Sequence, residues 1–200
     1  EGGMEITPGV IYDDYCPGGG YPSNQCTLFL PELSNDSVTY LVHKDLILSS
    51  ELQSVLSEQL YLSIIIEKQD GTFYVKDKLA LIEDTPLVSS RLTGVSNNSS
   101  DKWWIWVLGY DSNRFYKFLI GGEEEEEGPF IQDIGPAISS ADLDIDQAAF
   151  SPNSKYLAIN SETYGVMLYD FDAESGALSN YRSIEYSGME KANGLVFSPN

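Results

Sequence analysis

Basic residues and histidine are scarce in this sequence of 200 residues. Only 11 lysines and arginines stand against 31 aspartates and glutamates, and His43 is the single histidine. The formal net charge of −20 repels phosphate backbones, and no local basic cluster offsets it, which argues against nucleic-acid binding. No apolar run approaches the roughly 20 residues that a membrane-spanning helix needs, and no signal peptide is recognisable. We therefore expect no transmembrane segment and a mature, already processed exported chain.

The motifs of common enzyme classes are also missing. The sequence contains no G-x-G-x-x-G, no Walker motif, no C-x-x-C, and no nucleophile elbow near its histidine. His43 stands in the polar stretch Val42-His43-Lys44-Asp45, so we expect a surface histidine rather than a member of a catalytic triad. Acidic pairs abound in so acidic a chain and do not by themselves indicate glycosidase chemistry. The sequence thus identifies no catalytic residue.

Cysteine is rare, with Cys16 and Cys26 separated by a short glycine-rich loop. A disulfide between them would remove about 2 to 3 kcal/mol of unfolded-chain entropy and would persist only in an oxidising compartment. The alternative is two unpaired, small hydrophobic side chains. The two cysteines cannot form a four-ligand Cys/His metal site, because His43 is the only histidine beside them.

A repeat is the strongest positive signal. The segment Phe150-Ser151-Pro152-Asn153 returns 47 residues later as Phe197-Ser198-Pro199-Asn200. Upstream, Trp106–Asp111 aligns with Leu157–Glu162, and Phe115–Ile120 aligns with Val166–Phe171, with Asn113 and Gly165 in or beside the intervening turns. Each unit reads as strand, polar turn and strand, and periods of about 40 to 50 residues are typical of solenoids and β-propellers.

The composition agrees with a propeller. The 13 tyrosines, 8 phenylalanines and 3 tryptophans favour strands, and the 17 glycines and 9 prolines favour frequent turns. We predict an all-β fold, a β-propeller of four-stranded antiparallel blades, in one domain over residues 1–200. Residues 1–36 are expected to be irregular, with blade-like units at 37–95, 96–146 and 147–193 and a further unit starting at 194–200. About four units make an incomplete ring, so we expect the natural chain to continue or this chain to be an excised part.

The first hundred residues are less regular. Val38–Val42 and Leu60–Ile66 are β-rich, and Asp70-Gly71 predicts a turn that folds the second run back onto Thr72–Val75. Ser50 could cap a short helix through Leu60. In the alternative, the leucines of that stretch lie on a loop that packs over the sheet.

Two acidic segments are candidate cation sites. Asp142, Asp144 and Asp146 alternate and could surround Ca²⁺, although Gln147 and Asn153 replace the glycine and glutamate of an EF-hand loop. The alternative is an exposed acidic approach to the strand at 148–150. The run Glu123–Glu127 is interpreted as the solvated tip of a hairpin rather than a binding site.

The tryptophans are the candidate ligand platform. In an alternating strand Trp104 and Trp106 share one face and Trp103 takes the other. At least one indole should therefore belong to the core, while Trp103 or Trp104 could stack on a sugar or peptide. Core packing of these indoles is the alternative.

The repeat also carries a family resemblance. The segments Phe150–Ala158, Leu168–Asp172 and Ser175–Ser179 resemble the blade signature of lactonase-like and WD-type seven-bladed propellers. The segments Trp104–Tyr110 and Phe115–Leu119, with Asn113, more closely resemble the N-terminal propeller of large exported Bacteroidetes surface proteins. Those proteins bear a C-terminal sorting domain of the gliding-motility or type IX secretion kind. The resemblance covers about residues 10–200, and its motifs specify blades rather than a reaction.

The resemblance implies a secreted or cell-surface bacterial module, part of a larger polypeptide with further domains, that binds a glycan or a protein without catalysis. One alternative is a lactonase-like hydrolase, in which acidic and histidine side chains would converge on the central channel around a divalent ion such as Ca²⁺. The other alternative is a structural spacer.

Overall fold

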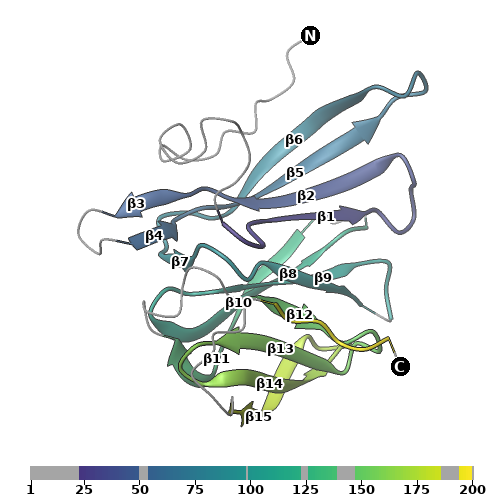
Figure 1. Cartoon of the computed structure of the whole chain (residues 1–200). Coiled ribbons are helices and arrows are strands. Elements are labelled where there is room, and N and C mark those ends of the chain that lie inside the picture. Colours follow the sequence, from purple (N-terminus) through teal and green to yellow (C-terminus); the bar gives the residue numbers. More distant parts are fainter. Residues whose placement is uncertain are drawn as a thin grey trace.

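The computed structural model describes residues 23–49, 54–97, 99–122, 126–138, 147–185 and 194–199. All the regular secondary structure in these ranges is β-strand, as the sequence predicts (Figure 1). Within them there is no helix that could cross a membrane.

Three four-stranded antiparallel sheets make up most of the fold. Blade 1 has the order β1 (Thr27–Pro31), β2 (Val38–Lys44), β5 (Leu60–Glu67) and β6 (Phe73–Ile82). Blade 2 has the order β8 (Thr93–Ser96), β9 (Trp103–Leu108), β10 (Ser112–Ile120) and β11 (Glu126–Ile138), listed from inside to outside. Blade 3 has the order β12 (Ala148–Phe150), β13 (Tyr156–Ser161), β14 (Gly165–Asp172) and β15 (Ala177–Ile184). In blades 2 and 3 each strand pairs with the next along the chain.

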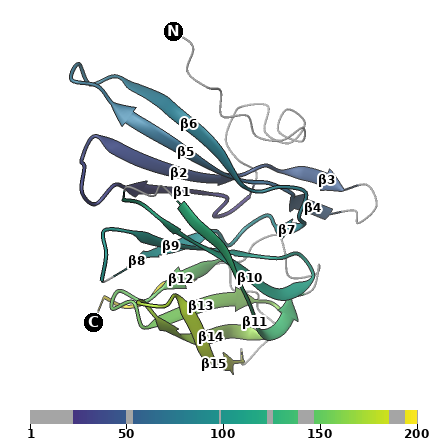
Figure 2. The same ribbon diagram turned by 180° about the vertical axis from the view of Figure 1, so that it is seen from behind.

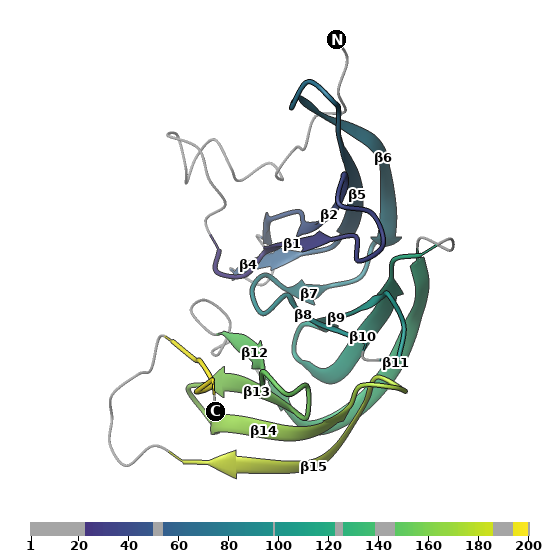
Figure 3. The same cartoon turned by 90° about the vertical axis from the view of Figure 1, so that its right-hand side faces the viewer.

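The three blades fan out with β1, β8 and β12 innermost and β6, β11 and β15 outermost (Figure 3). This arrangement of four-stranded meanders is that of a β-propeller, here an incomplete ring, and the predicted fold class is confirmed. A small sheet of β3 (Ile47–Ser49), β4 (Ser54–Ser57) and β7 (Leu87–Val88) projects beside blade 1 (Figure 2). The strands β3 and β4 are an insertion between β2 and β5, which the repeat pattern does not predict.

The core lies between the blades. Alternate residues of β9 face opposite sides, so Ile105 and Val107 pack on blade 1 while Trp104 and Trp106 pack on blade 3. Both faces of this central blade are thus buried, which explains why β9 reads as a continuous apolar run rather than as an alternating one. The contact between blades 2 and 3 includes Phe115, Leu157, Ile159, Met167, Tyr169 and Phe171.

The predicted hairpins are present. Asp70-Gly71 connects β5 and β6, with Gly71 at a φ of 77° and Asp70 Oδ1 accepting from the Thr72 backbone N–H. Gly165, at a φ of 72°, closes the hairpin between β13 and β14. Glu126 and Glu127 of the acidic run lie in β11, which pairs with β10. Residues 123–125 lie outside the described ranges, so the solvated hairpin tip stays a prediction.

Three expectations need correction. The helix from Ser50 to Leu60 is wrong in its described part, because Ser54–Ser57 form β4 and Leu60 begins β5. Leu56 is buried and pairs with both Ile47 and Val88, so contacts distant in sequence override the helical spacing of the leucines. The first sheet already begins at Thr27, and blade 2 begins at Thr93 rather than at residue 96.

The third correction concerns the second copy of the tetrapeptide. Residues 194–199 form no strand, whereas the first copy begins at Phe150, the last residue of β12. The backbone N–H of Leu195 nevertheless donates to Gln147 Oε1 at 2.9 Å. Ala148, which lies 47 residues before Leu195, donates in the same way to Gln25 Oε1 at 2.8 Å. An equivalent backbone hydrogen bond to a glutamine thus precedes each copy, but only the first copy adjoins a paired strand.

Candidate functional site

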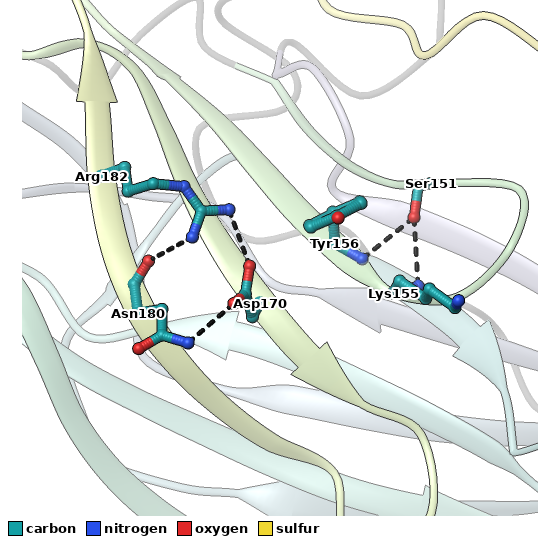
Figure 4. A network of polar contacts seen from close by, with 6 residues as sticks. All are labelled: Ser151, Lys155, Tyr156, Asp170, Asn180 and Arg182. Carbon is teal, nitrogen blue, oxygen red and sulfur yellow. Dashed lines mark hydrogen bonds and ion pairs between the residues drawn. The ribbon is translucent and has the colours of Figure 1, made fainter.

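The first copy of the repeated tetrapeptide forms a tight turn between β12 and β13. Ser151 Oγ accepts hydrogen bonds from the backbone N–H groups of Lys155 and Tyr156, at 3.1 and 3.0 Å (Figure 4). The same hydroxyl donates to Asn153 Oδ1 at 2.8 Å. Ser154 adopts a φ of 55° inside this turn. A short side chain with one hydroxyl can satisfy these backbone donors, which explains the serine of the motif. We call residues Ser151–Lys155 the repeat turn.

A hollow of about 330 Å³ lies on one side of the repeat turn. We call it the first hollow, and it is lined by Ser151, Pro152, Asn153, Tyr156, Leu168, Phe197, Ser198 and Pro199. The two copies of the tetrapeptide thus face each other across it. Tyr156 is 37% exposed. The volume of the first hollow is within the range of ligand sites, which begins at about 300 Å³.

An ion pair lies beside Tyr156 on the same face of blade 3. Asp170 pairs with Tyr156 across β13 and β14, and its carboxylate accepts from Arg182 Nη2 at 2.6 Å and from Asn180 Nδ2 at 2.8 Å (Figure 4). The hydrogen bond from Arg182, followed by that from Asn180, lowers the pKa of Asp170. The face therefore carries an aromatic ring beside an ionised carboxylate and a guanidinium.

A second hollow, of about 400 Å³, lies on the other side of the repeat turn. It is lined by Ser99, Asn153, Ser154, Lys155, Phe171, Asp172, Ala173 and Glu174. Asn153 lines both hollows, so the repeat turn forms the ridge between them.

Blade 2 holds the wall of the second hollow in place. Trp104 Nε1 donates to the Ala173 carbonyl at 2.9 Å, and Lys117 Nζ donates to the Gly176 carbonyl at 2.6 Å. Gly176 adopts a φ of 61°, and its Cα lies so close to the Trp104 indole that a side chain would not fit between them. The turn at 172–176 is therefore fixed by side chains of the neighbouring blade.

Neither Trp103 nor Trp104, the predicted ligand platform, is freely exposed in the structure. Trp104 is only 4% exposed and belongs to the core, which was the alternative reading of the sequence. Trp103 is half-buried, and its Nε1 donates to the Pro31 carbonyl at 2.9 Å, which links blades 1 and 2. Tyr156 was not singled out from the sequence. Its exposure could have been predicted from its position directly after the repeat turn and next to the buried Leu157, which points to the opposite face of β13.

The predicted metal and disulfide sites lie largely outside the described residues. Asp142, Asp144 and Asp146 fall in the range 139–146, which is not described, so the Ca²⁺ site stays a prediction. Elsewhere in the described chain no three His, Cys, Asp or Glu side chains gather into a metal-binding group. Cys26 is buried, its Sγ lies 3.0 Å from the Ser23 carbonyl oxygen, and burial raises the pKa of its thiol. Cys16 lies outside the described ranges, and the bridge also stays a prediction.

The expected surface position of His43 is wrong. The side chain is fully buried, stacks on Tyr61 with ring centroids 5.3 Å apart, and lies 3.2 Å from Ser63 Oγ. Burial, assisted by the charge of Lys78, lowers the pKa of His43 to about 4. The polar stretch misleads because side chains of the adjacent strand β5, Tyr61 and Ser63, lie against the imidazole.

Lys44, the next residue, is buried as well. Its Nζ donates to the carbonyls of Val88 and Ser90, both at 2.7 Å, and so ties blade 1 to the segment that leads into blade 2. Burial lowers the pKa of Lys44 to about 7. Lys44 and His43 are thus enclosed by the protein, and neither side chain is accessible to solvent.

No protein-family model and no curated protein matches the chain. The solved structures that resemble it include two that are described as candidate 6-phosphogluconolactonases. The one from Bacteroides uniformis is 14% identical with a TM-score of 0.36, over 78% of this chain and 55% of that one. The one from Bacteroides fragilis is 12% identical with a TM-score of 0.32, over 89% of this chain and 74% of that one. The chain thus spans about half the length of the Bacteroides uniformis protein.

Proposed function

We propose that this chain is a glycan-binding propeller module and that the first hollow is its binding site. The observation that carries the proposal is the half-exposed Tyr156 ring in a hollow of about 330 Å³, with the Asp170–Arg182 pair beside it. We also propose, following the family resemblance, that the module belongs to a larger secreted or cell-surface bacterial protein.

Sugars present two kinds of surface, and the site offers a partner for each. The C–H face of a pyranose ring packs on an aromatic ring, and the hydroxyl groups need a few fixed polar partners. Tyr156 supplies the ring. Asp170 supplies hydrogen-bond acceptors, and Arg182 supplies donors, in an arrangement that Asn180 fixes. Because these groups already hold one another, binding a sugar would require little ordering of side chains.

Affinity electrophoresis in gels with neutral polysaccharides, followed by calorimetry on any that bind, tests this proposal. Tyr156→Phe keeps the ring and should bind like the wild type. Tyr156→Ala should weaken binding about 5- to 30-fold, which corresponds to about 1 to 2 kcal/mol for a lost aromatic contact.

Phe73→Ala is the matched control, because Phe73 is 63% exposed but lies on the outer strand β6 of blade 1. It should leave binding unchanged. Equal affinity of Tyr156→Ala and the wild type would contradict the proposal. The lactonase alternative predicts instead that lactones are hydrolysed with added Ca²⁺ and that chelation stops the reaction, whereas a spacer would show neither activity.

A further inference from the structure

We infer that the ligand is an extended oligosaccharide that crosses the repeat turn and occupies both hollows at once. This inference rests on the proposed function, since it takes the first hollow as a sugar site. Its basis is that the two hollows flank the same turn and share Asn153, an exposed residue on the ridge between them. A ligand that fills the first hollow and continues over Asn153 would reach the second.

The second hollow offers mainly polar contacts. Its exposed lining side chains include Lys155, Asp172 and Glu174, whereas Phe171, only 7% exposed, belongs to the core. Asp172 Oδ1 accepts from the backbone N–H groups of Glu174 and Ser175, at 3.0 and 2.9 Å, and its pKa is lowered by the hydrogen bonds from Ser175. Asp172 is therefore anionic at neutral pH, which favours the hydroxyl groups of a neutral sugar over a carboxylate or a sulfate ester.

Hydrogen bonds hold the ridge and one wall of the second hollow in place. The repeat turn is fixed by the hydrogen bonds to Ser151 Oγ, and the turn at 172–176 is fixed by Trp104 and Lys117 of blade 2. A ligand that spans both hollows thus meets two preformed subsites, and the second subsite adds affinity without further ordering of the protein. A short ligand fills one hollow and gains nothing from the other.

Calorimetry with neutral gluco-, manno- and xylo-oligosaccharides of two to six units tests this inference. In the series that binds, affinity should rise at least tenfold from the shortest ligand to the longest and then level off. The double variant Lys155→Ala/Glu174→Ala removes two exposed side chains of the second hollow and leaves the turn bonds, which their backbone N–H groups make, in place. It should lose most of the gain for long ligands and bind disaccharides within about twofold of the wild type.

Two results would overturn the inference while leaving the proposed function intact. One is an affinity that is the same for all chain lengths, and the other is a double variant that weakens short and long ligands equally. Tyr156→Ala should weaken ligands of every length. If it has no effect, or if no series binds, the proposed function itself fails.

Discussion

Gly176 lies where the turn at 172–176 of blade 3 touches blade 2, and its replacement by alanine probes that joint. A Cβ at this position would lie 2.7 Å from Trp104 Cε2 and 2.8 Å from Cδ2 and Cζ2, closer than real Cβ contacts. The turn would have to move away from a ring that is itself buried, which costs about 1 to 3 kcal/mol. The φ of 61° adds about 1 kcal/mol for any residue with a side chain. We therefore expect Gly176→Ala to lower the free energy of unfolding by about 2 to 4 kcal/mol.

Gly71→Ala separates the two contributions. Gly71 also has a positive φ, of 77°, but no atom lies within 4 Å of the added Cβ. This variant should lose only about 1 kcal/mol, from the backbone alone. Urea unfolding followed by circular dichroism measures both values. If Gly176→Ala costs no more than Gly71→Ala, the close packing of the two blades at Trp104 is refuted.

Three further predictions concern stability. Because the pKa of Lys44 is about 7 when folded and 10.5 ordinarily, the unfolded chain binds more protons between these values. Stability should thus rise by about 2 to 3 kcal/mol from pH 7 to 9, and urea titrations should show no such rise in Lys44→Met. The folded pKa of His43, about 4 against 6.5, predicts a loss of up to about 3 kcal/mol as the pH falls from 6.5 to 4. His43→Phe should lack that part of the acid destabilisation, and an identical acid profile would refute it. Gln132 exchanges two hydrogen bonds with the Leu178 backbone, at 2.7 and 3.0 Å, so Gln132→Leu should cost about 1 to 2 kcal/mol in thermal or urea unfolding, unlike the exposed control Phe73→Ala.

The fold could be predicted because its signals are local. Residues adjacent in sequence determine the turn at Asp70-Gly71, the β9 and β10 segments and the hairpin at Gly165. The insertion of β3 and β4 could not be predicted, because Leu56 pairs with the distant Val88 as well as with Ile47. Such a contact, between residues far apart in the chain, leaves no periodic trace in the sequence.

The candidate site was only partly accessible to sequence reasoning. The repeated tetrapeptide predicted the turn between β12 and β13, because its serine stabilises that turn. The hollows beside the turn could not be predicted, because residues from several strands line them. Large aromatic residues drew attention to Trp104, yet a blade stacked on both sides buries such a residue in its centre. His43 misled for a different reason, because Tyr61 and Ser63 of the adjacent strand β5 lie against its imidazole ring.

The most direct test of the glycan site is a titration of ¹⁵N-labelled protein with a neutral oligosaccharide of six units, followed by two-dimensional NMR. The amide signals of the repeat turn, Tyr156 and Glu174 should shift together as the ligand saturates, while those of the outer strand β6 should stay in place. Shifts confined to other parts of the protein, or none for any neutral oligosaccharide at millimolar concentration, would contradict the account.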